Sequence, residues 1–166
     1  LGKGEFSVDD NESIGMQTVS YDSYYLISSK LSAPVTNKGT GKPMFFQYTF
    51  LNDQEVDCAG QYLKFIQPGS LASQSDLNSE TPYSIMFGPD SCMGGTSSVM
   101  FIMRKNGTYY RSKYPLKVPN ENKITHIITL GLFPNNTVLI KLDNDSTHVE
   151  NLDDEFVGND RTVLDT

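Results

Sequence analysis

Residues 98–113 read SVMFIMRK-NG-TYYRSK, and this stretch decides the fold class. Two runs rich in aromatic and branched residues, 98–105 and 108–113, flank the dipeptide Asn106-Gly107. Because Asn and Gly accept the positive φ angles of a tight turn, this dipeptide between two such runs is the strongest short-range signal for a β-hairpin. The stretch therefore predicts two antiparallel strands.

Similar runs of aromatic and branched residues follow one another along most of the chain. They cover residues 23–31, 43–51, 61–67, 82–88, 125–133, 137–143 and 147–150. A second hairpin is predicted around residues 134–136, and residues 69–79 allow one short helical turn. No segment has the 3.6-residue apolar period of a long helix. We expect an all-β protein, a sandwich of two antiparallel sheets.

The chain of 166 residues has a formal net charge of −7. This charge argues against nucleic acid and against an anionic membrane as partners, because both attract clustered Lys and Arg. Residues 141–166 carry eight acidic and two basic residues, so most of the acidity belongs to the C-terminal part. No apolar run approaches the ~20 residues of a membrane-spanning helix. No signal-peptide pattern begins at Leu1, so we expect any such peptide to have been removed.

Cys58 and Cys92 are the only cysteines. An even number suits a disulfide, and two buried free thiols are the alternative. Two cysteines alone cannot form a four-ligand structural zinc site. Four N-x-S/T sequons support secretion only weakly, because such sequons arise by chance in a chain rich in Asn, Ser and Thr. They lie at Asn11, Asn106, Asn135 and Asn144.

Side chains alternate between the two faces of a strand, and this rule separates core from surface. In residues 61–67, we expect Leu63 and Phe65 to face the core and Tyr62 and Lys64 to share the opposite face. A tyrosine beside a lysine on an exposed face can bind a polar ligand by ring stacking and hydrogen bonding. An ordinary solvated face is the alternative. In residues 82–88, alternation predicts that Tyr83, Ile85 and Phe87 face one way. Ser84, Met86 and Gly88 are expected to face the other way.

Three polar features could indicate other chemistry. Asp153 and Glu155 would share a strand face, as paired carboxylates of glycosidases do, but a solvated acidic terminus is the expected reading. Residues 143–146, DNDS, resemble the start of a calcium loop, yet the required Gly and distal Glu are missing, so we expect a turn. His126 opens an apolar strand and is expected to be a hydrogen-bonded core histidine rather than a catalytic base.

The sequence around the two cysteines resembles the calreticulin/calnexin family of lectin chaperones. Residues 58–64, CAGQYLK, are similar to the family's C-G-G-x-Y-V-K strand, and residues 83–92, YSIMFGPDSC, to its longer Y-x-I-M-F-G-P-D-x-C signature. Shorter matches extend the resemblance from about residue 1 to residue 157. They are residues 37–39 (NKG), 46–48 (FQY), 125–126 (TH) and 134–143 (PNNTVLIKLD). The hairpin at Asn106-Gly107 is more similar to the calreticulin branch of the family.

The resemblance implies a legume-lectin-like (concanavalin A-like) jelly roll in the lumen of the endoplasmic reticulum, with the cell surface or secretion as further possibilities. It implies a disulfide between Cys58 and Cys92 and binding of the terminal glucose of monoglucosylated N-glycans on folding glycoproteins. By motif position, four residues would hydrogen-bond the glucose and two would pack around it. The hydrogen-bonding residues are Tyr62, Lys64, Tyr83 and Asp90; the packing residues are Met86 and Ile102.

The family also holds a structural calcium ion. Matching positions assign the backbone carbonyls of Glu12 and Ile14 as two of its ligands. Residues 1–157 correspond to the globular lectin domain, and residues 158–166 to a tail or a remnant of the segment that follows the family's Pro-rich arm. That arm recruits a protein disulfide isomerase, and its repeats are not found among these residues. We therefore expect the sequence to be part of a longer chain.

These observations lead to three hypotheses of function. The first is a calcium-stabilised, non-enzymatic lectin chaperone that captures glucosylated and misfolded glycoproteins reversibly. The second is a protein-binding chaperone or surface module that has lost sugar affinity. The third is a glycoside hydrolase, which needs two facing carboxylates ~5–9.5 Å apart in a cleft.

Overall fold

The computed structural model describes residues 2–3, 6–9, 15–20, 22–37, 39–92, 97–113, 115–118, 123–143, 146–152 and 156–159. The chain divides into two compact units. The smaller unit comprises residues 1–33 and 71–80, and the larger comprises residues 34–70 and 81–166. Every residue that the resemblance assigns to the sugar site belongs to the larger unit.

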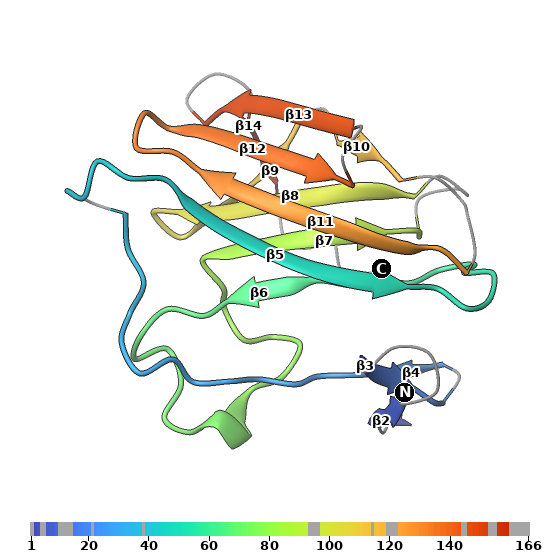
Figure 1. Ribbon diagram of the computed structural model, residues 1–166. Coiled ribbons are helices and arrows are strands. Elements are labelled where there is room, and N and C mark those ends of the chain that lie inside the picture. The colour runs from blue at the N-terminus through green and yellow to red at the C-terminus, as the bar shows by residue number, and fades with distance from the viewer. Residues whose placement is uncertain are drawn as a thin grey trace. The chain divides into compact units, whose positions relative to one another are not determined.

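In its described residues, the smaller unit contains four short strands and one helical turn (Figure 1). Strand β1 (Gly2–Lys3) pairs in parallel with β4 (Ser23–Tyr24), and β2 (Phe6–Asp9) pairs antiparallel with β3 (Gly15–Thr18). A 3₁₀ turn, η1 (Gln74–Asp76), lies in the predicted position. Ser73 is its N-cap, and the Ser73 side chain accepts a hydrogen bond from the Ser75 backbone.

The predicted strand over residues 23–31 is wrong beyond Tyr24. Its apolar side chains are exposed rather than packed on a sheet: Leu26 is 54% exposed, Ile27 59% and Leu31 58%. A strand requires a hydrogen-bonding partner as well as a suitable composition, and residues 25–31 pair with no strand of the described chain.

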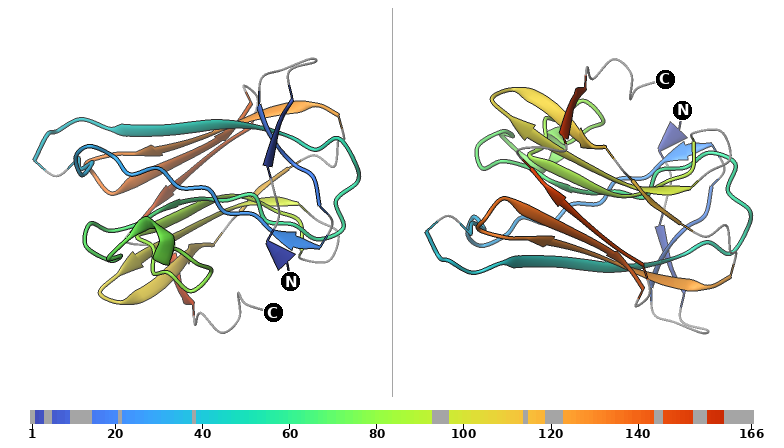
Figure 2. Two further views of the ribbon diagram at one scale, coloured as in Figure 1. Left: turned by 90° about the horizontal axis from the view of Figure 1, so that it is seen from below. Right: turned by 90° about the horizontal axis from the view of Figure 1, so that it is seen from above.

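The larger unit is a sandwich of two antiparallel sheets (Figure 2). Sheet I has the order β14-β9-β8-β7-β6, with β10 also paired to β8; sheet II has the order β13-β12-β11-β5. The strands of sheet I are β6 (Leu63–Phe65), β7 (Ile85–Asp90), β8 (Ser98–Lys105), β9 (Thr108–Ser112), β10 (Leu116–Lys117) and β14 (Phe156–Asn159). Those of sheet II are β5 (Met44–Leu51), β11 (Thr125–Leu132), β12 (Thr137–Leu142) and β13 (Ser146–Asn151).

The core lies between the two sheets, and strands β8, β11 and β12 each contribute alternate side chains to it, together with Phe87 of β7. Sheet I contributes Phe87, Val99 and Phe101, and sheet II contributes alternate residues of β11 and β12. The sheet II members are Ile128, Leu130, Leu132, Val138, Ile140 and Leu142. Burying one such side chain stabilises a fold by about 1.5–3 kcal/mol, so this pattern fixes which face of each sheet is internal.

Both predicted hairpins are confirmed. Asn106 and Gly107 have φ angles of 53° and 84°, and Lys105 pairs with Thr108 across the turn. A two-residue turn with two positive φ angles fixes the register of β8 against β9, because the loop length leaves one pairing. The hairpin between β11 and β12 turns at residues 133–136, where Asn136 has a φ of 61°.

Candidate functional site

The two cysteines form a disulfide that joins the ends of two antiparallel segments. Cys58 is bonded to Cys92, and both residues are exposed. Behind the bond, the Ser91 amide donates to the Ala59 carbonyl (2.9 Å), and Gly60 forms a bridge with Asp90. The disulfide and this pairing together hold the loop that carries Asp90.

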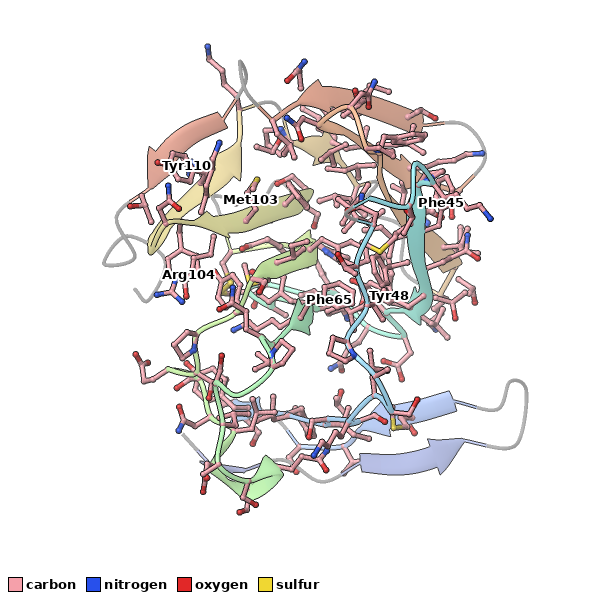
Figure 3. All side chains as sticks on the ribbon, turned by 90° about the vertical axis from the view of Figure 1, so that its left-hand side faces the viewer. Phe45, Tyr48, Phe65, Met103, Arg104 and Tyr110 are labelled. Atoms are coloured by element: carbon pink, nitrogen blue, oxygen red, sulfur yellow. A yellow bond between two sulfur atoms is a disulfide. The ribbon has the colours of Figure 1, made fainter. Side chains whose placement is uncertain are left out.

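A tyrosine from the opposite sheet supports the same segment from inside. The Tyr48 hydroxyl donates a hydrogen bond to the backbone carbonyl of Gln61 (2.6 Å). The backbone N–H of Gln61 donates to the backbone carbonyl of Pro89 (2.9 Å). Gly88 makes room for this contact: a Cβ on it would lie 2.1 Å from the Gln61 carbonyl oxygen, and its φ is 152°. Burial raises the pKa of Tyr48, so its phenol remains a donor. Figure 3 shows Tyr48 and Phe65 in the space between the sheets.

Tyr62 follows directly and is oriented by two contacts. Its hydroxyl donates a hydrogen bond to Asp90 Oδ2. Its ring lies on Gly60, where a Cβ would come within 2.1 Å of the ring carbon Cε2. Burial, and then the hydrogen bond to Asp90, raises the pKa of Tyr62 well above its usual value. Tyr62 therefore remains a neutral phenol, and Asp90 is its acceptor.

The remaining predicted sugar residues lie beside Tyr62 on the side of sheet I away from the core. Tyr83, Met86, Ile102 and Tyr109 form a separate buried cluster, against which Tyr62 packs. Lys64, which is exposed, holds its Nζ 5.1 Å from the centre of the Tyr83 ring. Tyr83 in turn lies 4.8 Å from the ring of Tyr109. The six residues assigned by motif position are thus gathered in one place. We call this surface the site face: Lys64, Met86, Ile102, Arg104 and Tyr109 on sheet I, with Tyr62, Tyr83 and Asp90 at its edge.

Burial divides the site face into a floor and a rim. Ile102 has no exposed surface, and Tyr83 and Met86 are 5% and 6% exposed. Tyr62 and Asp90 are half-buried, and Lys64 is exposed. The accessible polar groups are therefore a phenol, a carboxylate, an ammonium and the guanidinium of half-buried Arg104, above an apolar floor. Such a set offers both donors and acceptors at fixed positions to a polyhydroxylated ligand.

Two predictions about strand faces are wrong. Tyr83 was expected to face the same way as Ile85 and Phe87, but it packs with Met86 instead. Strand β7 begins only at Ile85, and at Ser84 the chain bends, so the two-residue period does not extend back to Tyr83. Leu63 was expected in the core and is 36% exposed, whereas Phe65 does pack against the core.

Sequence analysis missed three residues that shape the site face. Tyr109 and Arg104 stand directly opposite each other on β9 and β8, and Gly60 lies beneath Tyr62. The hairpin signal contained the first two: a two-residue turn at Asn106-Gly107 pairs Lys105 with Thr108 and hence Arg104 with Tyr109. Gly60 matches the second glycine of the motif C-G-G-x-Y-V-K, but the motif does not show that the Tyr62 ring lies on it.

The other predicted polar features fall into two groups. His126 is confirmed as a hydrogen-bonded core residue, 4% exposed, with Nδ1 2.8 Å from Asp143 Oδ2. The glycosidase carboxylates Asp153 and Glu155 lie outside the described residues, as do the calcium positions Glu12 and Ile14. Among the residues that the structure does describe, no group of three or more His, Cys, Asp or Glu is arranged to hold a metal ion. In the same part of the chain, no helix is long and apolar enough to span a membrane.

A pocket of about 540 Å³ lies elsewhere in the larger unit. Its lining includes Ile85, Phe101 and Met103, whose side chains lie on the core side of sheet I. Figure 3 shows Met103 and Arg104 on opposite sides of β8. The pocket is therefore separate from the site face.

Comparison with known proteins agrees with this geometry. The sequence profile of the Calreticulin family matches residues 4–161. The chain belongs to the calreticulin family. It is 32% identical over 156 residues to calreticulin of Oryctolagus cuniculus and 33% identical over 156 residues to calreticulin of Bombyx mori, in each case over 94% of this chain. The T. cruzi calreticulin globular domain superposes with a TM-score of 0.80 at 27% identity and covers 94% of this chain.

Membership of the calreticulin family accounts for the fold, which is the concanavalin A-like sandwich of that globular domain. The family is one of lectin chaperones. The chain spans 36% of the rabbit protein, 38% of the silkworm protein and 59% of the T. cruzi domain. Because the chain spans only part of these proteins, their activities are extended to this calreticulin-family chain as proposals.

Proposed function

We propose that this calreticulin-family chain is a non-enzymatic lectin domain that binds the terminal glucose of monoglucosylated N-glycans on folding and misfolded glycoproteins. Its proposed compartment is the endoplasmic reticulum lumen, with the cell surface or secretion as alternatives. One observation carries the proposal. Six residues assigned from sequence motifs, and separated by up to forty positions, meet on the site face around a disulfide-held loop.

The proposed chemistry follows from the rim of the site face. Asp90 accepts from sugar hydroxyls, Lys64 donates to them, and the Tyr62 hydroxyl can do both. Met86 and Ile102 pack in the floor beneath the sugar and keep the rim rigid. A neutral hexose must lose its bound water to reach these groups, so each hydrogen bond contributes a net ~0.5–1.5 kcal/mol or, to a charged group, ~1.5–3 kcal/mol. We expect weak, reversible capture, which suits a chaperone.

Calcium is part of the proposal through the family resemblance alone. The backbone carbonyls of Glu12 and Ile14 would supply two of its oxygen ligands, the type that Ca²⁺ prefers. The ion would stabilise the fold and is assigned no step in sugar binding.

A second candidate is a protein-binding chaperone module that has lost sugar affinity. It is favoured by apolar side chains on the outer surface of sheet II: Phe45, Leu51 and Val149 are 54%, 46% and 55% exposed. Exposed apolar groups of this kind can mark a surface that binds proteins. Competition separates the candidates, since free disaccharide releases a glycoprotein from a lectin and leaves a protein-only binder unaffected.

Calorimetric titration with glucosyl-α1,3-mannose, with calcium present, tests the proposal. Wild type should bind, and Lys64→Ala should lose most of the affinity because one charged rim donor is gone. Lys105→Ala is the matched control, since Lys105 is exposed at the end of strand β8, opposite Thr108 at the hairpin. Absence of heat with folded wild type, or equal loss in both variants, would contradict the lectin proposal.

A further inference from the structure

Sheet I is basic although the chain as a whole is acidic. Its strands from β6 to β10 contain five basic residues and one acidic residue, Asp90. The basic residues are Lys64, Arg104, Lys105, Arg111 and Lys117. These strands thus hold five of the 13 basic residues of the chain but one of its 20 acidic residues, whereas the formal net charge of the whole chain is −7. A local excess of one sign attracts ligands of the opposite sign whatever the total charge.

The strand register places two of the arginines around Ile102. Lys64, Met86, Ile102 and Arg111 are successive partners across four neighbouring strands, so they form one row, and Arg111 extends the site face on β9. Arg104 lies two residues along β8 from Ile102 and stands opposite Tyr109. Neighbouring strands are ~4.8 Å apart and second neighbours along a strand ~6.8 Å apart. Arg111 is therefore the cross-strand neighbour of Ile102, and Arg104 is the nearest residue to Ile102 along β8 on the same face.

In the part of the chain that the structure describes, neither arginine is neutralised by a carboxylate. Both are half-buried, and within the described residues no carboxylate forms an ion pair with Arg104 or Arg111. The Arg104 guanidinium carbon lies 5.8 Å from the centre of the Tyr109 ring, which orients the group without neutralising its charge. A half-buried, oriented guanidinium presents a planar set of donors that matches a carboxylate or a phosphate.

We propose that the site face includes a subsite for an anionic substituent, phosphate or carboxylate, on the sugar next to the one bound by Tyr62, Lys64 and Asp90. This inference rests on the proposed function, because it extends the same carbohydrate site. Arg104 and Arg111 bind the anion, and Tyr109 positions Arg104. The chain then prefers acidic over neutral oligosaccharides of the same length.

Charge complementarity selects this ligand over the other occupants of a sheet face. A purely apolar partner would leave two guanidinium groups half-buried beside it without hydrogen-bond acceptors, which costs free energy. Nucleic acid carries far more negative charge than two arginines neutralise, and the acidic remainder of the chain would repel it.

Calorimetric titration with three disaccharides tests the subsite. They are glucosyl-α1,3-mannose, the same disaccharide with a phosphate on mannose C6, and glucosyl-α1,3-mannuronic acid. Wild type should bind at least one anionic disaccharide about tenfold more tightly than the neutral one, a difference that should shrink at high salt. The two anionic arms distinguish phosphate from carboxylate. Arg104→Gln and Arg111→Gln should each reduce the preference for the anionic disaccharide, whereas Lys105→Gln should retain both this preference and the affinity for the neutral disaccharide.

The outcomes separate this inference from the function on which it rests. Equal binding of the neutral and both anionic disaccharides to wild type would overturn the subsite and leave the lectin proposal standing. A preference that survives in both arginine variants would also overturn it. If no disaccharide binds folded wild type, the lectin proposal and the subsite both fail.

Discussion

The Tyr62 hydroxyl donates a hydrogen bond to Asp90, whose other carboxylate oxygen accepts one from the Cys92 amide at 3.0 Å. Asp90 is thus held between the proposed sugar-binding strand and the disulfide. The residues that bind sugar in this account are fixed by backbone features on both sides of them, Gly60 beneath Tyr62 and the Cys58–Cys92 bond beyond Asp90.

Gly60→Ala should weaken sugar binding without unfolding the domain. The new methyl group would lie 2.1 Å from the Tyr62 ring, so the ring must move away from its position over Gly60. Because a side-chain ring can move, we expect a small change in stability and about a tenfold loss of affinity for glucosyl-α1,3-mannose, measured by calorimetry. Gly15→Ala is the control, since a Cβ there meets nothing within 4 Å. Unchanged affinity in Gly60→Ala would show that the Tyr62 position is not needed.

Removing the disulfide should lower both stability and sugar affinity. The bond closes a sequence separation of 34 residues, which in the chain-entropy model is worth about 4 kcal/mol at most. Cys58→Ser with Cys92→Ser should therefore reduce the free energy of unfolding measured in urea, and the freed loop should hold Asp90 less firmly. Reduced wild type should behave as the double variant does. A double variant as stable as oxidised wild type would contradict the expected role of the bond.

Asp143→Asn should destabilise the domain at neutral pH. Burial raises the pKa of Asp143, but hydrogen bonds from His126 and the Ile127 amide lower it more, so the pKa lies below its usual 3.8. The ionised carboxylate therefore stabilises the folded state above the unfolded-state pKa, and this stabilisation disappears as the pH falls through the lower folded-state pKa. The Asp143 side chain is 38% exposed, so solvent screens its interaction with His126, and we expect a loss of about 1 kcal/mol or less at pH 7.

The pH dependence is the decisive part of that prediction. The free energies of unfolding of wild type and Asp143→Asn, measured in urea, should approach each other as the pH falls below 3.8. Asp53→Asn, which removes an exposed carboxylate in the same unit, should cost little at any pH. A difference that stays constant down to the acid limit of folding would show that the charge of Asp143 plays no part.

Calcium should raise the melting temperature. The proposed ion binds the folded chain and not the unfolded one, so added Ca²⁺ stabilises by mass action. We expect the transition measured by circular dichroism to rise between EDTA and millimolar CaCl₂. Magnesium at the same concentration should have less effect, because it demands a stricter octahedral geometry. Identical melting in EDTA and CaCl₂ would remove calcium from the account.

Much of the fold follows from local sequence, and each wrong prediction has a physical reason. The hairpin at Asn106-Gly107 was predictable because the turn residues set the loop length, which sets the register. Residues 25–31 have a strand-like composition but pair with no strand among the residues that the structure describes, and pairing is not encoded locally. Tyr83 was assigned to the wrong face because the alternation breaks at the Ser84 bend, which composition does not reveal.

The site was predictable only in part. Tyr62 and Lys64 follow from alternation on one strand, but their meeting with Asp90 and Tyr83 depends on pairing between segments about twenty residues apart. Motif resemblance supplied those residues. The register of the hairpin at Asn106-Gly107 pairs Arg104 with Tyr109, so this pair was predictable from the sequence. It was missed because the turn was used to identify the two strands and not to align their side chains.

Mapping the binding surface by NMR tests the central claim most directly. The amide spectrum of ¹⁵N-labelled wild type, titrated with glucosyl-α1,3-mannose in calcium, reports which residues the sugar touches. The account predicts shifts concentrated at residues 60–65, 83–92 and 102–111, on and around the site face. Absence of shifts, or shifts centred on Phe45 and Val149 of sheet II, would contradict it.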